Sequence, residues 1–408
     1  MYYVCSKFRA IFAIMKLILF DPKATRQNLL PLTYTRPVGA MRVGILTIAE
    51  KWGYRLKSDF YYHTESYLQH KFEGAHFGEG PFMYINGSIC PDNSLVADVE
   101  MLQPGQVLMV GDTVVAFRSG QIANPEEAGH EFEKVQHSGD PVMIENLWDI
   151  FSKNGKELDK DFDVVTYGRK SAPIDPSNVV FNAEKVFIEP GAKVLASTLN
   201  ASGGPIYIGK TAEVMEGCLI RGGFALCDHS VLKMGAKIYG PTTIGPHSKV
   251  GGEVNNSVFF SNSNKAHDGF IGNSVIGEWC NIGADSNNSN LKNNYAEVKL
   301  WNYVKGGFTG TGLQFCGLIM GDHSKCGINT MFNTGTVVGV SCNVFGSGFP
   351  RNFIPDFSWG GAQGLTTYST DKAFETAELV FKRRSVLFSD VEKHILQTVF
   401  TETEKWRK

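Results

Sequence analysis

The stretch Ile276-Gly277-Glu278-Trp279-Cys280-Asn281-Ile282-Gly283 decides how the chain folds, because it repeats an aliphatic residue followed by glycine after six positions. The same pair recurs across residues 183–348, starting at positions 208, 244, 250, 271 and 338. A six-residue period is not helical. It is typical of a β-helix in which each hexapeptide lays one short strand on one side of a three-sided coil. A β-sandwich would also be rich in glycine and aliphatic residues, but strict alternation of apolar and polar residues is rare here.

The chain on either side of this coil has a different character. Residues 15–172 combine apolar strands, the first at Lys16–Phe20, with helical spacing at Arg42–Lys57 and Pro141–Ser152, and such a mixture favours an α/β domain. Beyond residue 348 the repeat stops, and Ser369 and Ser389 occupy positions expected for helix N-caps. The expected organisation is an α/β domain over residues 15–172, a parallel β-helix over 173–348, and an irregular segment with C-terminal helices over 349–408.

The first residues imitate a secretory signal, because they are apolar and carry Lys7 and Arg9 near the start. Lys16 interrupts the apolar run, however, and no cleavage site of small residues follows. We therefore expect residues 1–14 to be a non-native or disordered start, and a buried first strand to begin after Met15.

Two segments of the coil lack the repeat, Ser261–His267 and Asp285–Val298. Both are polar and rich in asparagine, and we expect them to project as loops, which often form the binding face of a solenoid. The glycine-rich run Gly306–Gly312 lacks the strand and helix that flank a phosphate-binding loop, so it is expected to be an insertion in the coil.

The composition excludes several classes of function. Lys and Arg number 39 and Asp and Glu 41, so the net charge of −2 gives no strong field that favours nucleic acid or membrane. No segment approaches the ~20 apolar residues of a membrane span. The eight cysteines are scattered without the spacing of a metal site, and they fit the reducing cytoplasm.

A spacing within the coil points to a specific chemistry. The run His267-Asp268-Gly269-Phe270-Ile271-Gly272 is followed by Asn281-Ile282-Gly283-Ala284, with Asn281 fourteen residues after His267. Together with an α/β domain ahead of the coil, this motif resembles the bacterial family of bifunctional N-acetylglucosamine-1-phosphate uridylyltransferases/glucosamine-1-phosphate acetyltransferases. The chain is similar to a shortened, divergent branch of it. The resemblance implies a nucleotidyltransferase-like α/β domain followed by a left-handed β-helix of hexapeptide repeats.

The resemblance also implies roles for residues of the coil. His267 would be the general base that accepts a proton from an amino sugar as its nitrogen attacks acetyl-CoA, a task that suits an imidazole with an unperturbed pKa of ~6.5. Asn281 and Asn290 would hold the substrate or orient the base. Members of the family are usually homotrimers with active sites between coils. The alternative is that His267 ends a polar loop and that Asn281 is an ordinary corner residue.

The motif departs from the family at its phosphate contacts. Phe270 stands where the family has a tyrosine, so a hydroxyl group that would contact the substrate is missing. We expect Lys233 and Lys265 to be the residues that meet a phosphate instead, although lysines are more often solvated surface residues. These changes leave the identity of the amino sugar open.

The N-terminal domain keeps only part of the family's triphosphate-binding pattern. Thr25 and Arg26 match it, Arg36 replaces a lysine, and Arg42 adds a further basic residue that could bind a phosphate. The glycines of the turn are absent, and Asn86-Gly87-Ser88 lacks the aspartate that would bind Mg²⁺. The alternative is that these basic residues are surface charges.

Three functions follow from these observations. The first is an acetyl-CoA-dependent transferase that N-acetylates an amino-sugar phosphate on the coil. The second is a nucleotidyltransferase that joins a hexose-1-phosphate to a nucleoside triphosphate with Mg²⁺, in which the coil is structural. The third is a non-catalytic scaffold that binds a sugar phosphate or a nucleotide.

Overall fold

A computed structural model describes residues 15–72 and 80–407, so the expectation for residues 1–14 lies outside the described part. The chain divides into two compact units. The first holds the chain up to Leu29, Arg36–Met41 and Leu46–Glu145, and the second holds Leu30–Thr35, Arg42–Ile45 and Asn146–Lys408. Two short N-terminal segments therefore group with the coil.

The first unit is an α/β fold built on a six-stranded mixed sheet with the order β2-β1-β3-β6-β5-β7. The parallel part pairs β1 with β2 and β3, and β6 runs antiparallel to β3 and β5. Tyr84 and Phe117 stack with ring centroids 4.5 Å apart in its core. The strands are β1 Lys16–Phe20, β2 Phe60–His63, β3 Phe82–Asn86, β5 Gln106–Val110, β6 Thr113–Ser119 and β7 Glu133–Gln136, with a small pair of β4 Ile89–Cys90 and β8 Val142–Met143.

The helices of the first unit are α2 Lys23–Asn28, α3 Ile48–Leu56, α4 Asn93–Met101 and α5 Ala128–Glu131, with a 3₁₀ turn η2 at Val38–Ala40. The predicted α/β class is confirmed, and so are the first strand and the hairpin of β5 and β6. Two predicted helices are corrected. Helix α3 begins only at Ile48, because Thr47 and Glu50 form a capping box. The region Pro141–Ser152 holds strand β8 and only one helical turn.

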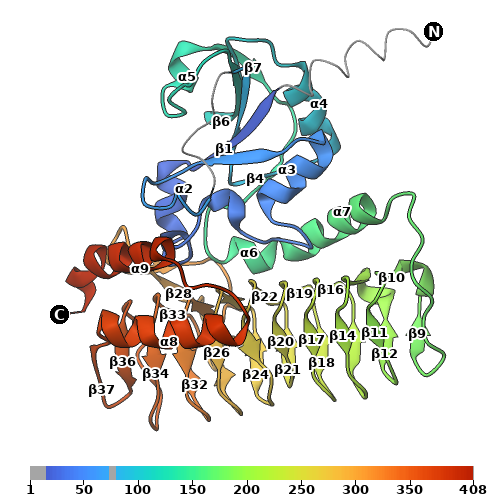
Figure 1. The fold of residues 1–408 in the computed structure, drawn as a ribbon, viewed down its shortest axis with the longest axis vertical. Helices are drawn as coiled ribbons and strands as arrows, with labels where there is room; N and C mark the ends of the chain where they lie inside the picture. The colour runs from blue at the N-terminus through green and yellow to red at the C-terminus, as the bar shows by residue number, and fades with distance from the viewer. Residues whose placement is uncertain (1–14, 73–79, 408) are drawn as a thin grey trace. The chain divides into compact units, whose positions relative to one another are not determined.

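The second unit is a β-helix of stacked coils, which confirms the predicted solenoid (Figure 1). Its strands form three parallel sheets. The first sheet runs β10 Val186–Ile188, β13 Ile206–Ile208, β16 Phe224–Leu226, β19 Thr242–Ile244, β22 Val258–Phe259, β25 Val275–Ile276, β30 Leu318–Met320, β33 Thr336–Val338 and β35 Phe353–Ile354. The second runs β11 Lys193–Val194, β14 Glu213–Val214, β17 Val231–Leu232, β20 Lys249–Val250, β23 Asn264–Lys265, β26 Asn281–Ile282, β31 Lys325–Cys326, β34 Asn343–Val344, β36 Ser358–Gly361 and the antiparallel β37 Gly364–Thr367. The third runs β9 Val179–Phe181, β12 Thr198–Asn200, β15 Leu219–Arg221, β18 Lys237–Tyr239, β21 Glu253–Asn255 and β24 Phe270–Gly272, after which β27 Asn287–Asn288 pairs with β32 Met331–Phe332.

The interior of the coil is held by aliphatic side chains and by a ladder of small polar groups. The Ser230 hydroxyl donates to the Gly245 carbonyl at 2.8 Å, and the Ser248 hydroxyl repeats this contact one coil later at 2.9 Å. Ser263, Ser324 and the thiols of Cys280 and Cys342 continue the ladder. Since buried polar groups are costly unless they are paired, this ladder explains why small polar residues are tolerated inside the coil.

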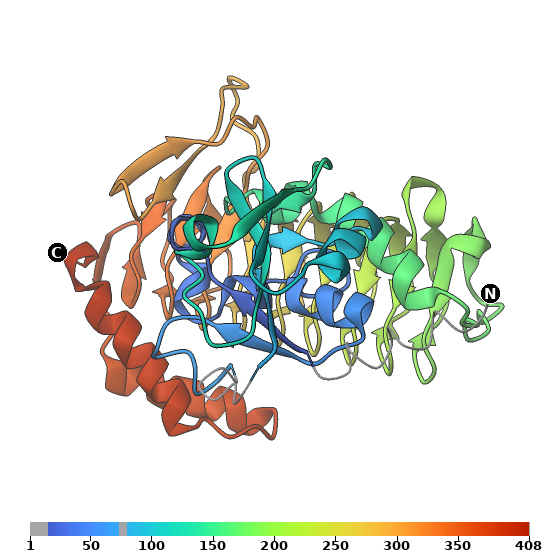
Figure 2. The same cartoon turned by 90° about the horizontal axis from the view of Figure 1, so that it is seen from above.

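The loops differ from those predicted. Segment Ser261–His267 does not project as a whole, because β23 pairs in register with β20 below it and β26 above it. After β27, residues 289–315 leave the coil and form a hairpin of β28 Lys299–Asn302 and β29 Gly307–Gly310, seen in orange in Figure 2. The glycine-rich run is therefore an insertion, as predicted. The coil itself continues past Gly348 through β35 and β36.

Helices cover parts of the coil within the second unit. They are α6 Asp149–Ser152, α7 Asn154–Thr166, α8 Thr370–Arg383 and α9 Asp390–Glu402, with 3₁₀ turns at Leu32–Tyr34, Ala183–Lys185, Ala201–Gly203 and Glu404–Trp406. Helix α8 is anchored by Phe381, whose ring stacks on Trp279 at 3.9 Å between centroids. The two predicted C-terminal helices are thus confirmed. Among the described helices, none combines the length and the apolar character that a membrane crossing requires.

Candidate functional site

The corner between β23 and β24 carries His267. Its side chain is exposed, and it is three residues beyond Asn264. Gly269 follows at a φ of +111°, and a Cβ added there would lie 2.2 Å from the Ser286 carbonyl oxygen. Only glycine fits this backbone, because the stacked coil leaves no room for a side chain between His267 and Phe270 at position 269.

Asn281 lies on the next coil, at the start of β26. It pairs in register with Asn264, whose side-chain amide donates to the Asn281 side-chain oxygen at 2.9 Å. The Asn281 side chain is exposed. The structure therefore places the two predicted catalytic residues on successive coils, where both side chains face solvent.

Phe270 and Asn290 come together over Gly272. A Cβ added at Gly272 would lie 2.5 Å from the Phe270 ring and 2.7 Å from the Asn290 amide nitrogen. The same amide donates to the Asn273 side-chain oxygen at 2.8 Å, which fixes its orientation. These two predicted substrate residues are half-buried neighbours on the side of the third sheet.

The two predicted lysines lie in different environments. Lys233 is half-buried at the same edge of the coil as His267. A Cβ added at Gly251 would lie 3.0 Å from the Lys233 Cβ. Lys265 is only 1% exposed, and its ammonium donates to the Gly251 and His267 carbonyls at 3.0 and 2.6 Å. The prediction that Lys265 meets a phosphate is wrong for this conformation, because its side chain points into the coil.

In the first unit Arg26 is not presented to a ligand. It is 8% exposed, its guanidinium donates to the Tyr67 hydroxyl at 2.8 Å, and it lies 3.8 Å from Asp21 and 3.5 Å from Glu65. Asp21 also accepts hydrogen bonds from the Val38 amide and the Thr64 hydroxyl at 2.8 and 2.6 Å. Burial raises the pKa of Asp21 to about 6, although these hydrogen bonds and Arg26 oppose the shift.

The other predicted phosphate residues are divided between the two units. Thr25 is half-buried on α2, a helix that replaces the expected glycine-rich turn. Arg36 is buried in the first unit at 3% exposure, whereas Arg42 belongs to the second unit and donates to the Ile45 carbonyl. The interpretation of these arginines as surface charges is wrong as well, because they are buried.

The residues at the end of β3 do not fit Mg²⁺. At the end of β3, the Asn86 side-chain oxygen accepts from the Ser88 amide and hydroxyl at 2.9 and 2.7 Å, and its amide nitrogen donates to Val114. No group of three or more His, Cys, Asp or Glu side chains suited to a metal occurs among residues 15–72 and 80–407. Neutral side chains that already bond one another are poor ligands for this ion.

The sequence reasoning missed the partners of the predicted residues. Asn264 stands one coil before Asn281, but the two are 17 residues apart, which is not a whole number of six-residue repeats, so the repeat alone did not reveal their pairing. Thr64 and Tyr67 carry no local signal, since they lie about 40 residues from Asp21 and Arg26 in the chain.

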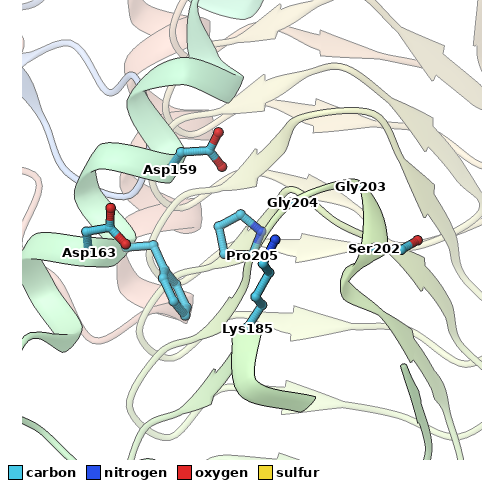
Figure 3. Close-up of a pocket in the computed structure, with 8 residues that line it drawn as sticks. Asp159, Asp163, Lys185, Ser202, Gly203, Gly204 and Pro205 are labelled. Carbon is cyan, nitrogen blue, oxygen red and sulfur yellow. The ribbon is translucent and has the colours of Figure 1, made fainter. Parts of the chain in front are cut away.

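A separate pocket of about 370 Å³ lies in the second unit (Figure 3). It is lined by Asp159, Phe162 and Asp163 of α7, by Lys185, and by residues 202–205. Partial burial and Asp163 raise the pKa of Asp159, whereas Lys185 lowers it. None of the predicted site residues lines this pocket.

The N-terminal resemblance is confirmed by comparison with known families. Residues 17–170 match the family model described as sugar nucleotidyl transferase. A similar curated protein is the "Bifunctional protein GlmU" of Methanocaldococcus jannaschii, 30% identical over 136 residues, which are 33% of this chain and 28% of that protein.

A second relative covers more of the chain. The "Bifunctional sugar-1-phosphate nucleotidylyltransferase/acetyltransferase" of Sulfurisphaera tokodaii is 27% identical over 218 residues, which are 53% of this chain and 47% of that protein. The chain thus matches less than half the length of either curated relative. A solved UDP-N-acetylglucosamine acyltransferase from Francisella novicida aligns over 55% of this chain and 90% of its own, at 12% identity and a TM-score of 0.31. At that score the likeness carries no functional argument.

Proposed function

We propose that the protein transfers the acetyl group of acetyl-CoA to the nitrogen of an amino-sugar phosphate. The observation that carries this proposal is the placement of an exposed imidazole, His267, and an exposed carboxamide, Asn281, on successive coils joined by Asn264. The name of the Sulfurisphaera tokodaii relative, which includes an acetyltransferase, supports it.

In the proposed reaction His267 takes a proton from the sugar amine as the amine nitrogen attacks the thioester carbonyl carbon. The tetrahedral intermediate then collapses, the carbon–sulfur bond breaks, and the leaving thiolate takes up the proton. Asn281 orients the acceptor or the imidazole, and Asn264 holds the Asn281 amide in place. Phe270 and Asn290 contact the sugar, and Lys233 attracts its phosphate.

We propose a homotrimer in which a neighbouring copy completes the site. Both predicted catalytic side chains face solvent, and one flat side of a coil encloses too little of a ligand as large as acetyl-CoA. Light scattering after size exclusion should give three times the 44.9 kDa mass of the chain. A stable monomer would contradict this part of the proposal.

All seven described cysteines are free, which fits a reducing cytoplasm.

Nucleotidyl transfer is the second candidate, favoured by the family match over residues 17–170. Against it, the buried Arg26 is engaged by Tyr67, Asp21 and Glu65, and the residues at the end of β3 do not suit Mg²⁺. We therefore propose that the first unit, at most, binds a sugar phosphate or a nucleotide, the role left for it by the scaffold hypothesis.

The test is a thiol-release assay with acetyl-CoA and a panel of amino-sugar phosphates, run beside a pyrophosphate-release assay with nucleoside triphosphates, hexose-1-phosphates and Mg²⁺. We expect thiol release with at least one acceptor and no pyrophosphate release. Pyrophosphate release alone would establish the second candidate, and no activity in either assay would favour a scaffold.

A further inference from the structure

Position 265 breaks the pattern of the coil's interior. Inward-facing side chains of the second sheet are aliphatic or small at the neighbouring coils, where Val250 precedes Lys265 in register and Ile282 and Cys326 follow on the next coils. Lys265 is 1% exposed in this column. A methionine or an isoleucine would fill the space without placing a charge inside the coil.

The ammonium group of Lys265 is tied to backbone rather than to an acid. It donates to the His267 carbonyl at 2.6 Å and to the Gly251 carbonyl at 3.0 Å. Gly251 begins the same corner one coil earlier, where a Cβ would meet the Ala266 carbonyl at 2.6 Å. Lys265 therefore joins the corner that carries His267 to the corner below it.

The contact has an energetic cost, which argues for a role of Lys265 other than stabilising the fold. Burial lowers the pKa of Lys265 to about 8, although Asp268 and Asp285 oppose the shift. Replacing a buried charged group by a well-packed apolar one often leaves stability unchanged or raises it.

We propose that Lys265 is a positioning residue that fixes the His267 corner in the geometry needed for acetyl transfer. The lysine acts through the backbone and touches no substrate. The effect on catalysis rests on the proposed function, whereas the effect on the corner does not.

Lys325 offers a partial control within the chain. It lies two coils further on in the second sheet, its ammonium donates to the His323 carbonyl at 2.8 Å, and burial lowers its pKa to about 8 as well. It differs in two ways, because it bonds a carbonyl of another corner and because it pairs in register with Asn281 and not with the column of Lys265. A Lys325→Met variant leaves the bonds of the His267 corner intact, so it serves as a control for backbone exchange at that corner and not for catalysis.

The first measurement is backbone hydrogen exchange of the full-length protein without ligands, comparing wild type, Lys265→Met and Lys325→Met. The Glu253 amide, bonded to the Gly269 carbonyl, and the Phe270 amide, bonded to Asn287, report on the corner. In Lys265→Met we expect both to exchange at least tenfold faster, with melting temperature unchanged or higher and no change at β13 to β16. Unchanged exchange at the corner would overturn the positioning role.

The second measurement is acetyl transfer. Lys265→Met should lower kcat by about tenfold with the KM for acetyl-CoA unchanged. An unchanged kcat in a folded Lys265→Met protein would overturn the effect on catalysis. If wild type shows no transfer, the proposed function fails while hydrogen exchange still decides the role of Lys265. Should Lys265→Met fail to fold, Lys265→Ile, which copies the residue of the next coil, takes its place.

Discussion

The two predicted sites differ in what surrounds their polar side chains. In the first unit Arg26 is buried and engaged by Asp21, Glu65 and Tyr67. On the coil His267 and Asn281 face solvent, and the Asn281 side chain accepts a hydrogen bond from Asn264.

Arg26 matches a binding motif in sequence but is buried, whereas His267 and Asn281 are exposed and can contact a ligand. A buried guanidinium already paired with carboxylates contributes to folding, and releasing it to bind a phosphate would leave an uncompensated charge inside the protein. An exposed imidazole can accept a proton without rearrangement of its surroundings. The following predictions test this contrast.

The largest effect is expected at the coil. His267→Ala should lower kcat of acetyl transfer by about 10² to 10⁴, the usual contribution of a general base. His394→Ala, which removes an exposed histidine on α9, should have no effect. Steady-state kinetics measures both variants. An unchanged rate in His267→Ala would show that His267 is not the general base.

In the first unit the corresponding change should affect stability. Arg26→Ala should lower the free energy of unfolding by about 3 kcal/mol, because it strands Asp21 in a buried position. Lys23→Ala on the exposed face of the same helix should change it little. Denaturant unfolding measures both. A nucleoside triphosphate that stabilises wild type but not Arg26→Ala would show that this arginine does bind ligand.

Asp21 predicts a pH dependence with a definite sign. Its pKa is raised from 3.8 to about 6 in the folded protein, so between about pH 4 and 6 the folded state holds a proton that the unfolded state has lost. The free energy of unfolding should therefore fall as pH rises through this window, by about 2 to 3 kcal/mol. The fall should be smaller by that amount in Asp21→Asn. Equal pH profiles in the two proteins would mean that Asp21 is not strained by burial.

The smallest effect is expected for Asn281→Ala, about tenfold in kcat, since the residue orients and does not exchange protons. Asn343→Ala, at the equivalent position of β34, is the control. A larger loss from Asn281→Ala than from His267→Ala would reverse the proposed roles.

The sequence was sufficient for the coil and insufficient for its chemistry. Repeated aliphatic-glycine pairs predict the stacked strands because each coil contacts only its neighbours. Residue 265 lies fifteen residues after Val250, which is not a whole number of six-residue repeats, so the burial of Lys265 did not follow from the repeat. Its polarity argued for a loop, and that reasoning failed because two backbone carbonyls satisfy the ammonium.

The N-terminal site could not be predicted in the same way. Thr25 and Arg26 match a motif, but their environment depends on residues about 40 positions away, including Thr64 and Tyr67. Contacts of this range leave no periodic pattern. The absence of the family's glycines was the local sign in the sequence that this segment differs from a triphosphate-binding turn, and the structure has helix α2 there.

The hairpin insertion has a closed neck. The chain leaves the coil at Asn290, whose carbonyl accepts from the returning Cys316 amide at 2.9 Å, and Leu318 then bonds the Ser274 hydroxyl of the preceding coil at 2.9 Å. These two bonds close the base of the insertion, but residues 291–315 also pack on the later coils. Trp301 stacks on Phe353 with ring centroids 4.1 Å apart, and the Tyr303 hydroxyl donates to the buried Asp356 carboxylate at 2.8 Å. Removing or exchanging the whole insertion would therefore uncover part of the coil, whereas its exposed turn, residues 304–306, is the place at which a reporter can be fused.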